Sequence, residues 1–350
     1  MYHSKRGQKP ESIEHPLYPV LVENMWGYID RSGHLIIEPK FDNFGYFQEG
    51  LAHVQVGRKW GFIDKTGNIV IEPRFDFAWE FQEGLAAVQV EGKYGYIDKH
   101  GNYAIEPKFN NAWSFCEGLA AVEIGGKWGF IEKTGKWAIQ PLLDWAFHFS
   151  EGLAAAGSGN KRGFIDKAGN FMLEIKFDFF ENFREGLARV EVGGKHEYVG
   201  GEGNQAIEPG LEIFKISQKS PRKPIKIEAR GKYGYMDKTG NIVIAPKFEG
   251  AKDFREGLAA VEVEREYGFI DKQGNFAIEP RFDNAWSFRE GLARVAEQHR
   301  CGFIDKSGNY VIPPTFYDAL DFYNGLAMVE VEEKWGYIDR SGHFVWEPSR

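Results

Sequence analysis

The chain has 350 residues, with 43 Lys and Arg against 51 Asp and Glu, and a formal net charge of −8. This acidic balance argues against nonspecific nucleic-acid binding, which requires a basic surface. The two cysteines, Cys116 and Cys301, provide no disulfide framework, and no apolar run approaches the roughly 20 residues of a membrane-spanning helix. We therefore expect a protein without a membrane span that works in a reducing compartment.

The first 16 residues are predicted to be a polar tail. They contain no apolar stretch of the kind found in secretory signals, which favours the cytoplasm.

From residue 17 onward, one pattern recurs with a period of 34 residues. The sequence WGYID at 26–30 returns as WGFID at 60–64, and further copies begin at 94, 128, 162, 233, 267, 301 and 335. A degenerate copy begins at 196, from which the step to 233 is 37 residues. The pattern predicts repeat units 1–6 over residues 17–209, an irregular basic insertion linker at 210–223, and units 7–10 over 224–350.

Each unit is predicted to fold as a three-stranded antiparallel meander. In the unit at 51–84, residues 51–56 alternate between apolar and polar, as in a strand, and 60–64 and 68–73 form the next two strands. Asp64 and Gly67 suit a tight turn, in which the carboxylate accepts backbone N–H groups and glycine supplies a positive φ. Pro73 is expected to end the third strand.

The remaining segment, 74–84, is a linker between units. Phe75, Ala78 and Phe81 are spaced three apart, which predicts one or two turns of tight helix over the sheet edge. A glutamate precedes the linker glycine in most units, and it is expected to pair with the recurrent basic residue of the linker. The glutamates are Glu49, Glu83, Glu117, Glu151, Glu185, Glu256 and Glu290, and the basic residues are Lys40, Arg74, Lys108, Lys176, Lys247 and Arg281.

The second strand is apolar on both faces, since Trp60 and Phe62 point to one side and Ile63 to the other. Small sheets that stack face to face would cover both faces, and Gly61 would allow a neighbouring group to approach closely. The array begins on a first strand and ends on a third strand, so no unit is split between the termini. We therefore expect an all-β repeat protein with meanders stacked as an open superhelix, or solenoid. A closed, propeller-like ring is the alternative.

Two motifs, KWGFIDKTG at 59–67 and EGLA at 83–86, resemble those of the WG-repeat (KWG) family, which is mostly bacterial. The resemblance extends over about residues 17–348. It implies a β-rich repeat fold without a general catalytic role. The copies at 162, 175 and 196–201 depart from the pattern.

No arrangement of residues points to catalysis, to a bound metal or to a cofactor. The nine histidines lack ligand spacing, and the recurrent turn aspartates are better explained as turn caps than as ligands. We therefore expect no catalytic residues.

A variable position of the linker is the first candidate binding feature. It is aromatic in several units but Glu181, Lys252 or Leu320 in others. The aromatic residues are Tyr46, Trp79, Trp113, Phe147 and Trp286. If exposed, they would form a stripe for a partner, whereas the simpler interpretation is that they cover the seam between units.

The basic run in linker 6 is the second candidate. Lys215, Lys219, Arg222 and Lys223 stand without an acidic neighbour, either in a tolerated surface insertion or in a hinge that binds an acidic partner. Arg189 and Arg294, in first strands, are expected at the surface.

These features predict a non-enzymatic scaffold that binds a protein or peptide. A glycan-binding protein that uses the linker aromatics is the alternative. An enzyme with a site at the centre of a closed ring is the second alternative.

Overall fold

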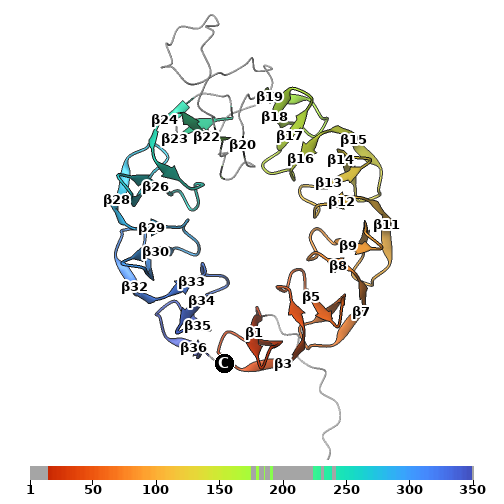
Figure 1. Ribbon diagram of the computed structural model, residues 1–350, viewed down its shortest axis with the longest axis horizontal. Coiled ribbons are helices and arrows are strands. Elements are labelled where there is room, and N and C mark those ends of the chain that lie inside the picture. Colours follow the sequence, from red (N-terminus) through yellow and green to blue (C-terminus); the bar gives the residue numbers. More distant parts are fainter. Residues whose placement is uncertain are drawn as a thin grey trace, which may run out of the picture.

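The computed structural model describes residues 15–174, 179–180, 185, 190–191, 224–229, 232–238 and 242–348. Within these residues the secondary structure is entirely β, in small antiparallel sheets arranged around a central opening (Figure 1). The described part of the chain contains no helix that is long and apolar enough to cross a membrane.

A typical sheet has four strands, which lie side by side in order from the centre of the ring to its periphery. In one of them, β4 (Asn43–Phe44) pairs with β5 (Leu51–Val56), which pairs with β6 (Lys59–Asp64), which pairs with β7 (Ile69–Phe75). The short inner strand β4 comes from the linker of the preceding repeat. Each such sheet therefore joins two successive repeats.

The other four-stranded sheets follow the same order, with short inner strands beside the opening and third strands at the periphery (Figure 1). Two further sheets have three strands and no inner strand, and one has two strands. The remaining inner strands are β8 (Phe77–Ala78), β12 (Asn111–Ala112), β16 (Trp145–Ala146), β20 (Phe179–Phe180), β25 (Gly250–Ala251), β29 (Asn284–Ala285) and β33 (Asp318–Ala319). The remaining first strands of the repeats are β1 (Tyr18–Val22), β9 (Ala86–Val90), β13 (Leu119–Ile124), β17 (Ala154–Ser158), β21 (Val190–Glu191), β22 (Pro224–Ala229), β26 (Ala259–Val263), β30 (Ala293–Glu297) and β34 (Leu326–Val331).

The second and third strands complete the sheets. The remaining second strands are β2 (Met25–Ile29), β10 (Lys93–Ile97), β14 (Lys127–Glu132), β18 (Lys161–Ile165), β23 (Lys232–Asp237), β27 (Glu266–Ile270), β31 (Arg300–Ile304) and β35 (Lys334–Asp339). The remaining third strands are β3 (Leu35–Phe41), β11 (Tyr103–Phe109), β15 (Trp137–Leu143), β19 (Phe171–Glu174), β24 (Ile242–Phe248), β28 (Phe276–Phe282), β32 (Tyr310–Phe316) and β36 (Phe344–Trp346).

The predicted helical turn in the linker is wrong. After the inner strand β8 the chain turns in a tight hairpin, in which Gln82 and Leu85 bridge across Glu83 (φ 54°) and Gly84 (φ 87°). Two successive positive φ values are typical of the two-residue hairpin turn whose twist matches the flanking strands. The spacing of the linker phenylalanines reflects burial against the sheets and not a helix, since Phe75 and Phe81 are both buried.

The third strand also differs from the prediction, because β7 continues through Pro73 to Phe75. This strand is the outer edge of its sheet, where a residue without N–H removes no ladder hydrogen bond. The pairing of β6 with β7 has a register shift between Trp60 and Phe62, and there the backbone of β7 lies close to Gly61. A Cβ on Gly61 would lie 2.5 Å from the Ile71 oxygen, so the glycine of the Trp-Gly pair is required by the backbone of its own sheet.

The turn after the second strand forms as predicted. The Oδ1 of Asp64 accepts hydrogen bonds from the N–H groups of Thr66 (2.9 Å) and Asn68 (3.0 Å), and Gly67 has φ 83°. The same bonds recur at the turn aspartates of other repeats, so these residues are turn caps.

The hydrophobic core lies between neighbouring sheets, as the apolar character of both faces predicts. In one cluster, Tyr96 and Ile105 of one sheet pack with Ala120, Val122 and Ile131 of the next. These side chains are almost fully buried, at 0–5 % exposure. Because a single sheet has no core of its own, the sheets stabilise one another by stacking.

The first and last sheets pack by this same interface. Tyr18, Val20 and Ile29 take the places that Ala120, Val122 and Ile131 occupy in the regular cluster, against Leu326 and Tyr337. The predicted all-β array of meanders is therefore confirmed, while the contacts between its ends correct the preference for an open superhelix in favour of the closed, propeller-like alternative (Figure 1). Closure requires no split unit, because it uses face packing instead of strand exchange.

The linker glutamates form a ladder around the ring, but not with the predicted partners. Glu83 accepts a hydrogen bond of 3.1 Å from the N–H of Gly118 in the next linker and pairs with Lys133 at 3.1 Å. The basic linker residues bind turn carbonyls instead: Arg74 donates to the Gly101 oxygen at 2.6 Å and lies over the Phe75 ring. The prediction failed because both sets have the same period, so the sequence could not indicate which partners meet.

At one place, the hydrogen bonds of the ladder join linkers that are not consecutive in the sequence. In regular repeats, the lysine after the turn aspartate donates to a glutamate carbonyl 50 residues earlier, as Lys167 does to Glu117. Lys238 instead donates to Glu151, 87 residues earlier, a difference of 37. The N–H of Gly257 likewise reaches Glu185 across 72 residues instead of 35. Linker 5 therefore bonds directly to linker 7.

Candidate functional site

The linker hairpins face the central opening (Figure 1). We define the inner rim as residues 43–50, 77–84, 111–118, 145–152, 250–257, 284–291 and 318–325. Most of these hairpins are held to the next by the glutamate ladder, with Glu-to-glycine distances of 3.1 Å for Glu49, 3.0 Å for Glu117 and 3.0 Å for Glu256. The rim is therefore fixed by hydrogen bonds that run from repeat to repeat.

The four aromatic side chains Trp79, Trp113, Phe147 and Trp286 are half-buried on this rim. Trp79 and Trp113 pack against the cores between sheets, and their rings lie 6.4 Å apart at 34°. Both interpretations of this position therefore hold in part: the rings cover the seam, and each keeps an accessible portion.

Tyr46 is out of register with these four residues. The hydroxyl of Tyr96 donates to the Trp113 oxygen, and in the first repeat Tyr28 donates at 2.8 Å to the oxygen of Gly45. Gly45 is therefore the residue equivalent to Trp113, and Tyr46 follows it, with 39 % of its surface exposed.

A cavity of about 590 Å³, which we call the closure pocket, opens where the two ends of the chain meet. Its walls come from the first two and the last two linkers and from the strands beside them. The lining residues are Phe44, Gly45, Tyr46, Gln48, His53, Glu80, Arg289, Arg294, Leu320, Asp321 and Tyr323. Because these residues belong to opposite ends of the sequence, the pocket exists only in the closed ring.

His53 and Gly45 form one wall of the pocket. The next three repeats have alanine at the position of His53, at Ala87, Ala121 and Ala155, and a large ring on the facing linker. Here the large ring is on the strand, and a Cβ at Gly45 would overlap it. Burial lowers the pKa of His53, against a smaller opposing effect of Glu80, so its imidazole is neutral at pH 7.

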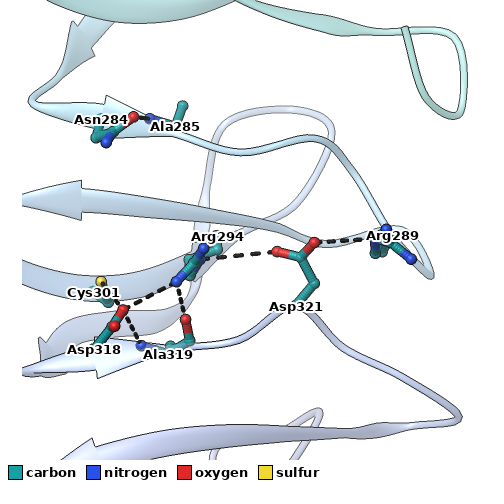
Figure 2. Close-up of polar contacts among 8 residues, drawn as sticks. All are labelled: Asn284, Ala285, Arg289, Arg294, Cys301, Asp318, Ala319 and Asp321. Carbon is teal, nitrogen blue, oxygen red and sulfur yellow. Dashed lines mark hydrogen bonds and ion pairs between the residues drawn. The ribbon is translucent and has the colours of Figure 1, made fainter. Parts of the chain in front are cut away.

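Two arginines and one aspartate form the opposite wall (Figure 2). Arg289 Nε lies 3.0 Å from Asp321 Oδ2, and Arg294 Nε lies 3.8 Å from Asp321 Oδ1. Arg294 also pairs with Asp318 at 3.0 Å, donates to the Ala319 oxygen and lies 3.7 Å above the Trp286 ring. The expectation that Arg294 is a surface residue is wrong, since its side chain is only 10 % exposed.

The remaining candidates are not brought to the closure pocket. Lys215, Lys219, Arg222 and Lys223, with Arg189, lie outside the described residues. Cys116 and Cys301 are both unbridged, and burial is the main cause that raises the pKa of each thiol. Within the described residues, no three His, Cys, Asp or Glu side chains are grouped so that they could hold a metal ion.

The repeat pattern did not point to five residues of the pocket: His53, Glu80, Arg289, Asp321 and Tyr323. A usable signal was present, because several of these residues break the pattern of the other copies. His53 stands where the next three repeats have Ala87, Ala121 and Ala155, and Tyr323 stands where the first two linkers have Gln48 and Gln82. Examination of every position at which repeats disagree would have found them.

The repeat pattern also decides the family. The profile of the WG containing repeat family matches residues 26–60, 60–94, 94–128, 128–161, 163–195, 233–265, 267–297 and 302–335. The chain belongs to the WG containing repeat family. The matches of this WG repeat chain leave out 196–232, which lies between Glu185 and Gly257, two residues that the ladder joins directly. No curated protein matches the sequence.

Solved structures share only the fold with this WG repeat protein. The crystal structure of the eukaryotic initiation factor aligns over 95 % of this chain and 95 % of its own, with TM-score 0.53 and 10 % identity. Hsv2p of Kluyveromyces lactis covers 73 % of this chain and 89 % of its own, with TM-score 0.39 and 9 % identity. The dihydro-heme d1 dehydrogenase NirN covers 88 % and 74 %, with TM-score 0.43 and 12 % identity.

Proposed function

We propose that the protein is a non-catalytic scaffold of the cytoplasm, which holds a protein or peptide partner against the inner rim of its ring. The observation that supports this proposal is the rim itself. Regular hydrogen bonds fix each hairpin, while the side chains between those bonds differ from copy to copy, as with Gly45, Trp113 and Lys252.

Such a rim favours binding for an energetic reason. Association is opposed by the entropy lost when loops become ordered, by about 0.5–1.5 kcal/mol for each immobilised side chain. Hairpins that Glu49, Glu83 and Glu117 already hold in place lose little further conformational entropy when a partner binds. Half-buried tryptophans then supply contact area of the type that is enriched in binding hot spots.

The test is selection of peptides by the purified chain from a random displayed library. The wild-type protein is expected to enrich a sequence motif, and the Trp113→Ala variant should weaken binding of the selected peptides at least about tenfold, as a loss of more than 1 kcal/mol implies. Tyr103→Ala is the matched control, since Tyr103 is an exposed aromatic residue (37 %) on the outer strand β11 of the neighbouring sheet.

Thermal unfolding of both variants must first show that they are folded. Peptides that bind equally to Trp113→Ala but not to Tyr103→Ala would place the surface on the outer edge and contradict the proposal. Chemical turnover of any bound compound would contradict the non-catalytic role.

A further inference from the structure

The closure pocket has the size and the mixed lining of a small-molecule site. Its volume of about 590 Å³ lies within the roughly 300–1,000 Å³ of ligand pockets. It combines aromatic walls with a few polar side chains, and four separate linkers contribute to it. Among the linkers that the structure describes, no other has a glycine at this rim position.

Aromatic rings at an angle to one another form one side of the pocket. Phe44 and Tyr46 lie 5.6 Å apart at 83°, and Tyr46 and Tyr323 lie 5.8 Å apart at 60°. Both tyrosines are 39 % exposed. Rings at these angles cannot sandwich a flat base, which needs parallel faces, but one exposed face can support an aliphatic ring through its C–H groups.

The polar side of the pocket is balanced in charge. Arg289 and Arg294 stand against Asp321 and Glu80, and the buried His53 is neutral. A ligand with a net charge would leave one of these groups without its counter-charge in a partly closed site, which is costly. The lining therefore favours an uncharged ligand.

The same lining is rich in hydrogen-bonding groups. Gln48 Nε2 donates to the Tyr323 hydroxyl at 3.2 Å, and the half-buried Glu80 adds a carboxylate. His53 Nδ1 is buried without a hydrogen-bond partner, and Asp321 Oδ1 has only the 3.8 Å ion pair with Arg294 Nε. Buried polar atoms without partners are rare in proteins and commonly indicate a missing water or ligand.

We propose that the closure pocket binds an uncharged sugar. One pyranose ring would lie against Tyr46 or Tyr323, while its hydroxyl groups bond with Gln48, Glu80 and the Arg289–Asp321 pair. This site goes beyond the proposed partner binding, because its lining residues come together only where the two chain ends meet and include none of the rim tryptophans.

The test is saturation-transfer NMR of the full chain with uncharged monosaccharides and short oligosaccharides, followed by calorimetry on those that bind. Parallel samples contain nucleosides and short peptides. At least one sugar is expected to bind, and Tyr46→Ala should weaken it at least about tenfold, in line with about 1.4 kcal/mol for a lost aromatic contact. Glu80→Gln should also weaken it, because a carboxylate that accepts two hydroxyl groups becomes an amide with one acceptor.

Tyr317→Ala is the matched control. Tyr317 is exposed (57 %), stacks on Arg300 and is not part of the closure pocket, so its loss should leave sugar binding unchanged. The inference is overturned if no sugar binds at millimolar concentration, or if Tyr46→Ala and Glu80→Gln bind like the wild type. It is also overturned if only nucleosides or peptides bind there. If Trp113→Ala no longer binds the selected peptides but still binds the sugar, the sugar site is separate from the peptide-binding surface around Trp113.

Discussion

The hydroxyl of Tyr337 donates a hydrogen bond of 2.9 Å to the carbonyl oxygen of Pro19, 318 residues away in the sequence. In a regular repeat the equivalent tyrosine, such as Tyr96, bonds to its own linker. For the last repeat, the first strand of the first repeat provides the acceptor. Tyr18 similarly supplies the ring that Phe115 provides elsewhere, at 5.7 Å from Tyr337.

We expect Tyr337→Phe to lower the free energy of unfolding by about 1–3 kcal/mol, because the buried Pro19 carbonyl loses its partner. Urea unfolding followed by tryptophan fluorescence measures this change. The control is Tyr317→Phe, at an exposed site, which should change stability by less than about 0.5 kcal/mol. Equal effects of the two variants would mean that the closing bond contributes nothing.

Tyr18→Ala should loosen the ring, because it leaves a cavity beside Tyr337. The variant has the alanine that most other repeats carry at this position. The cost expected for a buried aromatic ring replaced by alanine is about 3–5 kcal/mol. Distances between spin labels at Asn24→Cys and Glu333→Cys, in a chain without Cys116 and Cys301, should broaden. A narrow distribution identical to that of the parent would refute closure through Tyr18.

Gly61→Ala should destabilise the protein by about 3 kcal/mol, because its Cβ would meet the backbone of β7, which cannot move aside cheaply. Gly57→Asn is the comparison: Gly57 has φ 64° and open space around it, and asparagine tolerates that conformation, so a change within about 1 kcal/mol is expected. If alanine were tolerated at position 61, the close approach of β7 could not explain the Trp-Gly pair.

Deletion of residues 187–223 removes 37 residues and joins linker 5 directly to β22. We expect this chain to fold cooperatively with the closure intact, because Glu185 already bonds to Glu256 and Gly257. Deletion of 85–118, one regular repeat, is the control. It removes one place from the ladder and should separate Tyr337 from Pro19. Small-angle scattering and thermal unfolding distinguish the two, and similar damage from both deletions would argue against the step in the ladder.

Stability should fall in acid because of the turn aspartates. The N–H of Asn275 is the largest cause that lowers the pKa of Asp271 below its ordinary 3.8, and Asp305 is held in the same way by Asn309. A carboxylate whose pKa is lower in the folded state stabilises the fold above its ordinary pKa, and this contribution is lost as the pH falls through the folded value. Urea midpoints between about pH 7 and about pH 3 should therefore decrease, and less so in Asp271→Asn, which does not titrate. A midpoint independent of pH would contradict this account.

Much of the local structure could be predicted from single repeats. The alternation at 51–56 indicated a strand, and Asp64 with Gly67 indicated a capped turn, because both signals depend on neighbours within a few residues. The linker was mispredicted because Phe75 and Phe81 have a spacing compatible with helix, while Glu83 and Gly84 adopt a hairpin. The positive φ of a glutamate is not expected from its type.

The candidate site was harder to predict. Trp79 and Trp113 were recognised from the variable linker position, but the pocket depends on His53, Glu80 and Asp321, which come from separate repeats. Their proximity follows from the closed ring. The tyrosine at position 18, where most other repeats have alanine, was the one residue whose type pointed to that closure.

The sequence by itself determined the repeat, its strands and capped turns, and membership in the WG containing repeat family, because a 34-residue period and short-range hydrogen bonds are visible within one or two copies. Only the tertiary structure decided that the ends meet, that Glu83 bonds to Gly118 and Lys133, and that the ladder passes from Glu185 to Gly257. Residues with the same period offer many equivalent pairings, and only the packing of whole sheets selects among them.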